Sequence, residues 1–253
     1  GGGGGAGPWG GAEACLSALS DGMLEDMALE DNRSRAHRYA ALVQTSPGDL
    51  SPITMSQLDG DFTDATLERL KSAKTIAILR GTKPDLMVER AKELVTAGIT
   101  ALEITLDSTS AFATLQRLRA ELPPDILLGV GTVSRPLEQL PEANSHGAVF
   151  CLAANFPEDM IAVAENLQML PVVGAADLDQ VAKAVAAGAR AVKLFHAEHD
   201  WDEETLSQCQ VNHPDITFVP VGGVGLGDRA RWESLGFTLL GMGEKLAGSD
   251  LKA

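Results

Sequence analysis

From residue 75 onward, short apolar stretches alternate with stretches in which apolar residues recur every three or four positions. Successive apolar stretches begin roughly 21 to 26 residues apart, the length of one strand, one helix and short loops. We predict strands beginning near Thr75, Ala101, Ile126, Ala148, Leu170, Ala191, Thr217 and Thr238, with a helix after each of the first seven. The clearest helices are predicted over 84–97, 110–122, 157–167 and 177–187, because proline or glycine marks their ends.

Eight strands alternating with helices, without a glycine-rich dinucleotide turn, favour a closed (β/α)₈ TIM barrel, an α/β fold, over an open doubly wound sheet. Only ten residues follow Gly243, so we expect a curtailed last helix. We predict that the barrel covers 73–253 and that 1–72 form an irregular, partly helical N-terminal extension. In this extension, 1–11 are low-complexity, 45–61 resemble a linker, and 64–72 form a short helix.

Composition narrows the class of partner and the compartment. The net charge of −15 and the lack of a Lys/Arg-rich run argue against nucleic acid or an anionic membrane surface as a binding partner. The sequence contains no uninterrupted run of about eighteen apolar residues, so we predict no transmembrane helix. Cys15, Cys151 and Cys209 are scattered, which favours a reducing compartment over a disulfide framework or zinc site. We expect a cytoplasmic protein. Because no methionine precedes Gly1, we also expect a fragment or processed form, which leaves organelle targeting open.

One strand candidate carries a lysine in its middle. In the sequence Ala-Val-Lys-Leu-Phe, Ala191, Lys193 and Phe195 share one face, so the ammonium points to an interior. Burial lowers the pKa of a lysine, and a neutral lysine can form a Schiff base with a ketone. The alternative is a lysine whose stem lies along the strand while its ammonium reaches solvent, and this stretch alone favours that alternative.

A second strand candidate carries a glutamate on the same kind of face. Alternation places Glu103 with Ala101 and Thr105, so its carboxylate also points inward. An inward carboxylate near Lys193 would supply a base beside an imine-forming amine, whereas the alternative is a structural ion pair. We favour catalysis because both residues lie near strand ends, where barrel enzymes hold their active sites.

Other strand ends carry candidate anion-binding residues. Arg80 could clamp a carboxylate or simply pair with a surface acid, and Thr132 ends the third strand. The glycines after the last two strands suit a phosphate site, since their backbone N–H groups can approach an anion: Gly222, Gly223, Gly241 and Gly243. The run 196–200 is rich in His and acidic residues but lacks a third distant ligand, so we expect no metal there. The acidic residues at 202–204 favour the start of a helix, because negative charge is stabilised at the positive end of the helix dipole.

Taken in order, several segments resemble the 2-keto-3-deoxy-6-phosphogluconate (KDPG) aldolase family, class I aldolases of the Entner–Doudoroff route. They are Ile76-Ala77-Ile78-Leu79-Arg80-Gly81, Leu102-Glu103-Ile104-Thr105-Leu106, Gly129-Val130-Gly131-Thr132-Val133, Ala191-Val192-Lys193-Leu194-Phe195 and Val221-Gly222-Gly223-Val224. The resemblance implies a homotrimer without metal or cofactor that cleaves a 2-keto-3-deoxy-6-phospho sugar acid to pyruvate and glyceraldehyde 3-phosphate. It makes Lys193 the Schiff-base lysine and Glu103 the proton shuttle. It assigns the keto-acid carboxylate to Arg80 and Thr132, and the phosphate to Gly222 and Gly223.

Some positions depart from the pattern of the family. The Leu-Asp-Ser after Thr105 is more similar to the 6-phosphogalactonate branch, whereas the last glycine loop continues with Glu244 in place of a serine whose hydroxyl helps to bind phosphate. His196 replaces a proline, and Ala153-Ala154 replace a Ser/Thr-Pro pair. Glu244 motivates an alternative, an aldolase for an unphosphorylated keto acid. The altered loops motivate another, an inactive barrel that serves as a binding or structural subunit.

Overall fold

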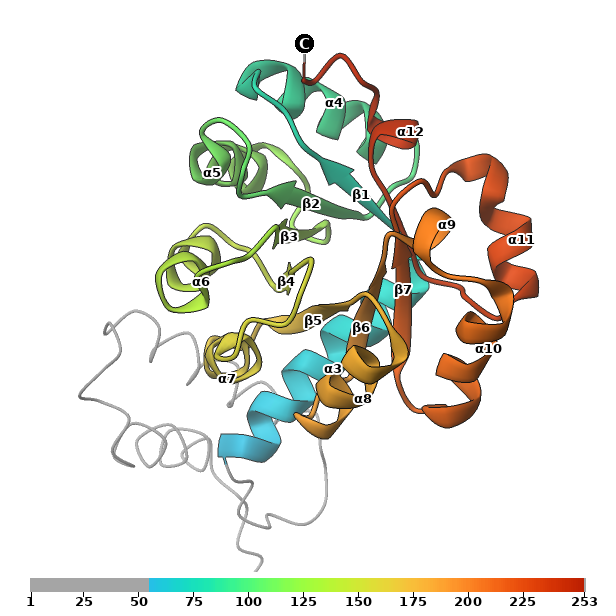
Figure 1. Cartoon of the computed structure of the whole chain (residues 1–253). Coiled ribbons are helices and arrows are strands. Elements are labelled where there is room, and N and C mark those ends of the chain that lie inside the picture. The colour runs from blue at the N-terminus through green and yellow to red at the C-terminus, as the bar shows by residue number, and fades with distance from the viewer. Residues whose placement is uncertain (1–54, 253) are drawn as a thin grey trace, which may run out of the picture. The chain divides into compact units, whose positions relative to one another are not determined.

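The computed structural model describes residues 55–252, with side chains from residue 62 onward. The predicted low-complexity segment and the residues up to 54 lie outside the described part. Eight parallel strands pair in chain order, and the last pairs with the first, which closes the barrel (Figure 1). The strands are β1 Thr75–Leu79, β2 Ala101–Thr105, β3 Leu127–Gly131, β4 Phe150–Leu152, β5 Leu170–Ala175, β6 Ala191–Phe195, β7 Thr217–Val221 and β8 Leu240–Met242.

The helices surround this barrel and connect successive strands (Figure 1). They are α4 Pro84–Thr96, α5 Ala111–Glu121, α6 Pro136–Ser145, α7 Met160–Asn166, α8 Leu178–Ala186, α9 Ala197–Asp200, α10 Glu203–Asn212, the 3₁₀ turn η1 Leu226–Asp228 and α11 Arg229–Ser234. The eight strands and the four clearest helices are confirmed, with small shifts at their ends. None of the described helices is long and apolar enough to cross a bilayer.

The last helix is a single turn, α12 Glu244–Ala247, as the short remaining sequence predicts. The chain then runs along the end of β1, where the backbone N–H of Thr82 donates to the carbonyl of Leu251 at 2.9 Å. Arg90 on α4 donates to the Ala247 carbonyl and pairs with Asp250 at 3.0 Å. The segment that follows α12 is therefore tied to the first βα unit.

Helix α3, Met55–Ala73, precedes the barrel and starts nine residues before the predicted start at residue 64, so the prediction of a linker up to residue 61 is wrong for its last seven residues. Weak amphipathicity and Gly60 conceal this helix in the sequence. Tertiary packing supports its second half, because Leu67 and Leu70 join the cluster inside the barrel. Arg69 also donates to the Asp125 carbonyl at 2.7 Å, just before β3, so the second half of α3 covers the amino-terminal end of the barrel.

Strand alternation divides the core into two layers. The outer layer lies between strands and helices and contains Val192 and Leu194, whereas Ala191 belongs to the cluster inside the barrel and Phe195 packs against that cluster. The predicted inward face of β6 is thereby confirmed. On β2, Ala101 lies in the inner cluster, and Glu103 follows it on the same face.

Candidate active site

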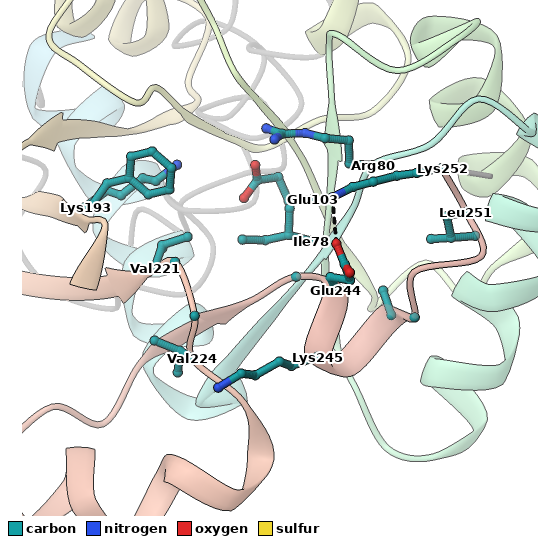
Figure 2. A pocket seen from close by; sticks show the side chains of 16 residues that line it. Ile78, Arg80, Glu103, Lys193, Val221, Val224, Glu244, Lys245, Leu251 and Lys252 are labelled. Atoms are coloured by element: carbon teal, nitrogen blue, oxygen red, sulfur yellow. Dashed lines mark hydrogen bonds and ion pairs between the residues drawn. The ribbon is translucent and has the colours of Figure 1, made fainter. Parts of the chain in front are cut away.

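A cavity of about 310 Å³ opens at the carboxyl-terminal ends of the strands (Figure 2). Six of the predicted residues line it: Arg80, Glu103, Lys193, Gly222, Gly223 and Gly243. Two do not, for different reasons. Thr132 lies behind Arg80 and accepts its hydrogen bond, while Gly241 lies in the barrel wall, where an added Cβ would overlap Val221. The structure thus brings most of the predicted residues to one place.

Lys193 lies on β6 with its side chain in the lumen and only 6% of the residue exposed. Its Nζ stands 4.5 Å from the centroid of the Phe195 ring, a neighbour that favours the cation. Burial nevertheless lowers the pKa of Lys193, because the charged form loses its hydration; the charge of Glu103 opposes this shift, and Arg80 adds to it. The ammonium can therefore lose its proton more readily than that of an ordinary lysine.

Glu103 lies on β2 and is 1% exposed. Burial raises its pKa, since a desolvated carboxylate is unfavourable, while the positive charges of Lys193 and Arg80 act in the opposite direction. Its Oε2 is buried and has no hydrogen-bond partner among the described residues. Figure 2 shows the carboxylate between Lys193 and Arg80. A buried oxygen without a partner costs stability, and this one lies at the cavity, where a bound molecule can reach it.

Gly131, at the end of β3, makes room for this carboxylate. A Cβ built on Gly131 would stand 1.5 Å from Glu103 Oε1 and 2.4 Å from its Cδ. A side chain at residue 131 would therefore displace the Glu103 carboxylate from this position. The sequence contains both residues in the matching segments, but only the register of β2 and β3 shows that they depend on each other.

Arg80 follows β1 and is fixed by three side chains. It donates to Thr105 Oγ1 at 3.3 Å and Thr132 Oγ1 at 2.9 Å, and its Nε lies 3.3 Å from a carboxylate oxygen of Asp107. Ser108 accepts a hydrogen bond from the backbone N–H of residue 81 at 3.1 Å. Arg80 thus combines both functions considered for it: it pairs with a half-exposed acid and lines the cavity, where it can bind a carboxylate.

Gly222 and Gly223 form a turn after β7 with φ of 101° and 79°, a backbone region that favours glycine. The turn is held from behind by Glu198, whose backbone N–H donates to the Gly222 carbonyl at 3.2 Å. The Glu198 carboxylate accepts two hydrogen bonds from Arg231, at 2.8 and 3.0 Å, and one from Trp232 Nε1 at 2.9 Å. A rigid turn at the cavity can present backbone N–H groups to an anion.

In the run 196–200, His196 precedes the single turn α9, and its Nδ1 lies 3.2 Å from Asp200 Oδ2. The described residues include no group of three or more His, Cys, Asp and Glu side chains placed to hold a metal ion. The acids after this turn open α10 as predicted, because Asp202 accepts a hydrogen bond from the backbone N–H of Thr205 at 2.7 Å.

The cavity is also lined by two lysines that the sequence analysis does not predict as site residues. Lys252 Nζ lies 2.7 Å from Glu244 Oε2, and both residues line the cavity. Lys245 lines it as well and pairs with Asp228 at 3.3 Å. No motif marks Lys252, since its place depends on how the segment after α12 folds back onto β1.

The fold and site define a (β/α)₈ barrel with a buried lysine and a buried glutamate at its carboxyl-terminal end. The family model for KDPG and KHG aldolase matches residues 66–253, and the chain belongs to this family. The 2-dehydro-3-deoxy-phosphogluconate aldolase of Pseudoalteromonas atlantica is 28% identical over 54% of this chain and 63% of its own length.

Two further comparisons cover more of the similar protein. The 2-dehydro-3-deoxy-6-phosphogalactonate aldolase of Escherichia coli is 29% identical over 68% of this chain and 83% of its own length. The solved structure of native KDPGal is 26% identical, with a TM-score of 0.63, over 70% of this chain and 89% of the other. Both sugar-acid branches of the family are thus represented among proteins similar to this chain.

Proposed function

We propose that this protein is a class I aldolase that cleaves a 2-keto-3-deoxy-6-phospho sugar acid, of the gluconate or galactonate type, to pyruvate and glyceraldehyde 3-phosphate. The observation that carries the proposal is the pair Lys193 and Glu103, buried in one lumen with the lysine pKa lowered and the glutamate pKa raised. The family and the names of its members support the substrate class.

The reaction begins at Lys193. Its neutral amine attacks the C2 ketone of the sugar acid, and loss of water from the carbinolamine gives an iminium. Arg80, held by Thr132, binds the neighbouring carboxylate and so orients C2 toward Nζ. The lowered pKa of Lys193 matters here, because only the deprotonated amine is a nucleophile.

Glu103 then moves the protons. Its Oε2, which has no protein partner among the described residues, accepts the proton of the C4 hydroxyl. The C3–C4 electron pair passes to the iminium, the aldehyde leaves, and an enamine remains on Lys193. Protonation of the enamine at C3 and hydrolysis of the resulting imine release pyruvate. The raised pKa of Glu103 suits a group that both takes up and returns a proton.

Trapping tests the covalent step. Incubation with pyruvate and borohydride should add one pyruvate, less one water and plus two hydrogens, to Lys193, located by peptide mass mapping. Lys193→Met should give no adduct. Glu103→Gln should still give one, while cleavage falls about 10²- to 10⁴-fold. If folded wild-type protein forms no adduct, the proposal fails and the inactive barrel becomes the better explanation.

The acceptor and the assembly complete the proposal. Glu244 motivates the alternative of an unphosphorylated acceptor, and comparing glyceraldehyde with its 3-phosphate as acceptors decides between the two. We also propose a homotrimer, as the family resemblance implies, and a cytoplasmic location, which the scattered cysteines favour. Light scattering in solution tests the trimer, and a monomer or dimer would contradict it.

A further inference from the structure

Lys252 stands at the cavity although it lies outside every motif of the family. Its ammonium lies 2.7 Å from Glu244 Oε2, and Figure 2 shows the two side chains meeting at the cavity. Each side chain of this pair is about half exposed, at 50% and 53%, so a bound molecule can reach both. Glu244 stands where the resemblance places a phosphate-binding serine, and Lys252 reaches it from the segment after α12.

The backbone before Lys252 is fixed rather than loose. Leu251 is 1% exposed, and its carbonyl packs against Gly81 so closely that a Cβ there would overlap it. Arg90 pairs with Asp250 at 3.0 Å, and this hydrogen bond lowers the pKa of Asp250. Because the segment is tied at both residues, it delivers the Lys252 side chain to the cavity at little further entropic cost.

Lys252 supplies positive charge beside the Glu244 carboxylate at this end of the cavity. A carboxylate at residue 244 would repel a phosphate dianion, and the ammonium of Lys252 offsets that charge. The second lysine, Lys245, is engaged elsewhere: it pairs with Asp228, which also accepts a hydrogen bond from the backbone N–H of Gly225 at 2.9 Å. Of these two lysines, Lys252 is the one whose ion-pair partner, Glu244, also lines the cavity.

We propose that Lys252 binds the phosphate of the acceptor and determines the preference for phosphorylated substrates, with Glu244 as the partner that phosphate replaces. In the free protein, Glu244 holds the ammonium at the cavity. When substrate binds, its phosphate takes the place of the carboxylate beside the ammonium of Lys252. A lysine from the segment after α12 thereby takes over the contribution of the missing serine. This inference rests on the proposed aldolase function.

Acceptor kinetics with pyruvate test the inference. Lys252→Gln should raise KM for glyceraldehyde 3-phosphate about tenfold or more, the loss expected for one charge-assisted contact, and leave KM for glyceraldehyde unchanged. Glu244→Gln should lower KM for the phosphorylated acceptor, because the competing carboxylate is gone. Lys252→Arg should restore most of the preference. Lys71→Gln, on α3 at the opposite end of the barrel, is the matched control and should change neither value.

The outcomes separate this inference from the proposed function. If wild type forms no pyruvate adduct on Lys193, the aldolase function itself fails. If every variant forms the adduct but Lys252→Gln changes both acceptors equally, or neither, only the phosphate role of Lys252 is overturned. A rise in KM for the phosphorylated acceptor in Glu244→Gln would also overturn it, since Glu244 would then assist phosphate binding directly.

Discussion

Gly131→Ala offers a test of Glu103 that removes no functional group. The new Cβ would stand 1.5 Å from Glu103 Oε1, whereas an ordinary contact begins at about 3.4 Å. The carboxylate must therefore retreat by about 1.9 Å, or β3 must shift. A displacement of about 1 Å can cost a catalytic step about 10²-fold, so we expect aldol cleavage to fall by at least that factor. The assay is the steady-state rate of pyruvate release.

Three comparisons show whether displacement of the carboxylate is the cause. Gly129→Ala lies two residues earlier on β3 and would overlap the Phe150 ring instead, so it should destabilise the barrel by about 1–3 kcal/mol while the Glu103 carboxylate stays in place. Gly227→Ala meets nothing within 4 Å and should be neutral. Adding Glu103→Asp to Gly131→Ala shortens the side chain and should recover part of the lost rate.

Clear results would refute this reasoning. Cleavage by Gly131→Ala within a few-fold of wild type would show that the position of the Glu103 carboxylate is unimportant. A loss of pyruvate trapping on Lys193 as large as the loss of cleavage would show instead that the whole site is disturbed. Equal losses in Gly129→Ala at equal stability would assign the effect to strand packing.

Two further predictions concern charge and stability. Glu103→Gln removes the negative charge that raises the pKa of Lys193, so trapping by saturating pyruvate should begin at a lower pH than in wild type. Arg80→Met removes a positive charge that lowers this pKa, so trapping should begin at a higher pH. Shifts in the same direction would contradict this coupling. Asp177→Ala removes the cap of α8, a 2.8 Å bond from the Gln180 N–H, and should cost about 1 kcal/mol, or about 2–4 °C in Tm. Calorimetry checks this, and an unchanged Tm would contradict the cap.

Much of the site could be predicted because strand alternation is local. The two-residue period puts Lys193 and Glu103 on the inward faces of their strands, and a closed barrel brings all inward faces into one lumen. The stretch around Lys193 taken alone favours an ammonium that reaches solvent, so the burial of this lysine follows only once the repeated βα pattern is included. The pKa shifts follow from the same burial. Arg80 was predicted at the cavity for a similar reason, since it follows the carboxyl end of β1.

Other features depend on contacts between distant residues. The first half of α3 escaped prediction because its sequence has a weak amphipathic pattern and contains Gly60, whereas the second half is supported by packing of Leu67 and Leu70. The mutual fit of Gly131 and Glu103 depends on strand register.

The sequence by itself determined the barrel, its inward lysine and glutamate and the family resemblance, because a repeated βα pattern and the alternation within each strand are properties of neighbouring residues. The sequence also shows that Glu244 places a carboxylate in the loop where the family resemblance leads us to expect a bound phosphate. Only the tertiary structure supplied its partner, since the ammonium of Lys252 reaches Glu244 through a segment fixed by Arg90 and the backbone of Thr82. Such a pairing is set by how loops close over the strand ends, and no local pattern encodes it.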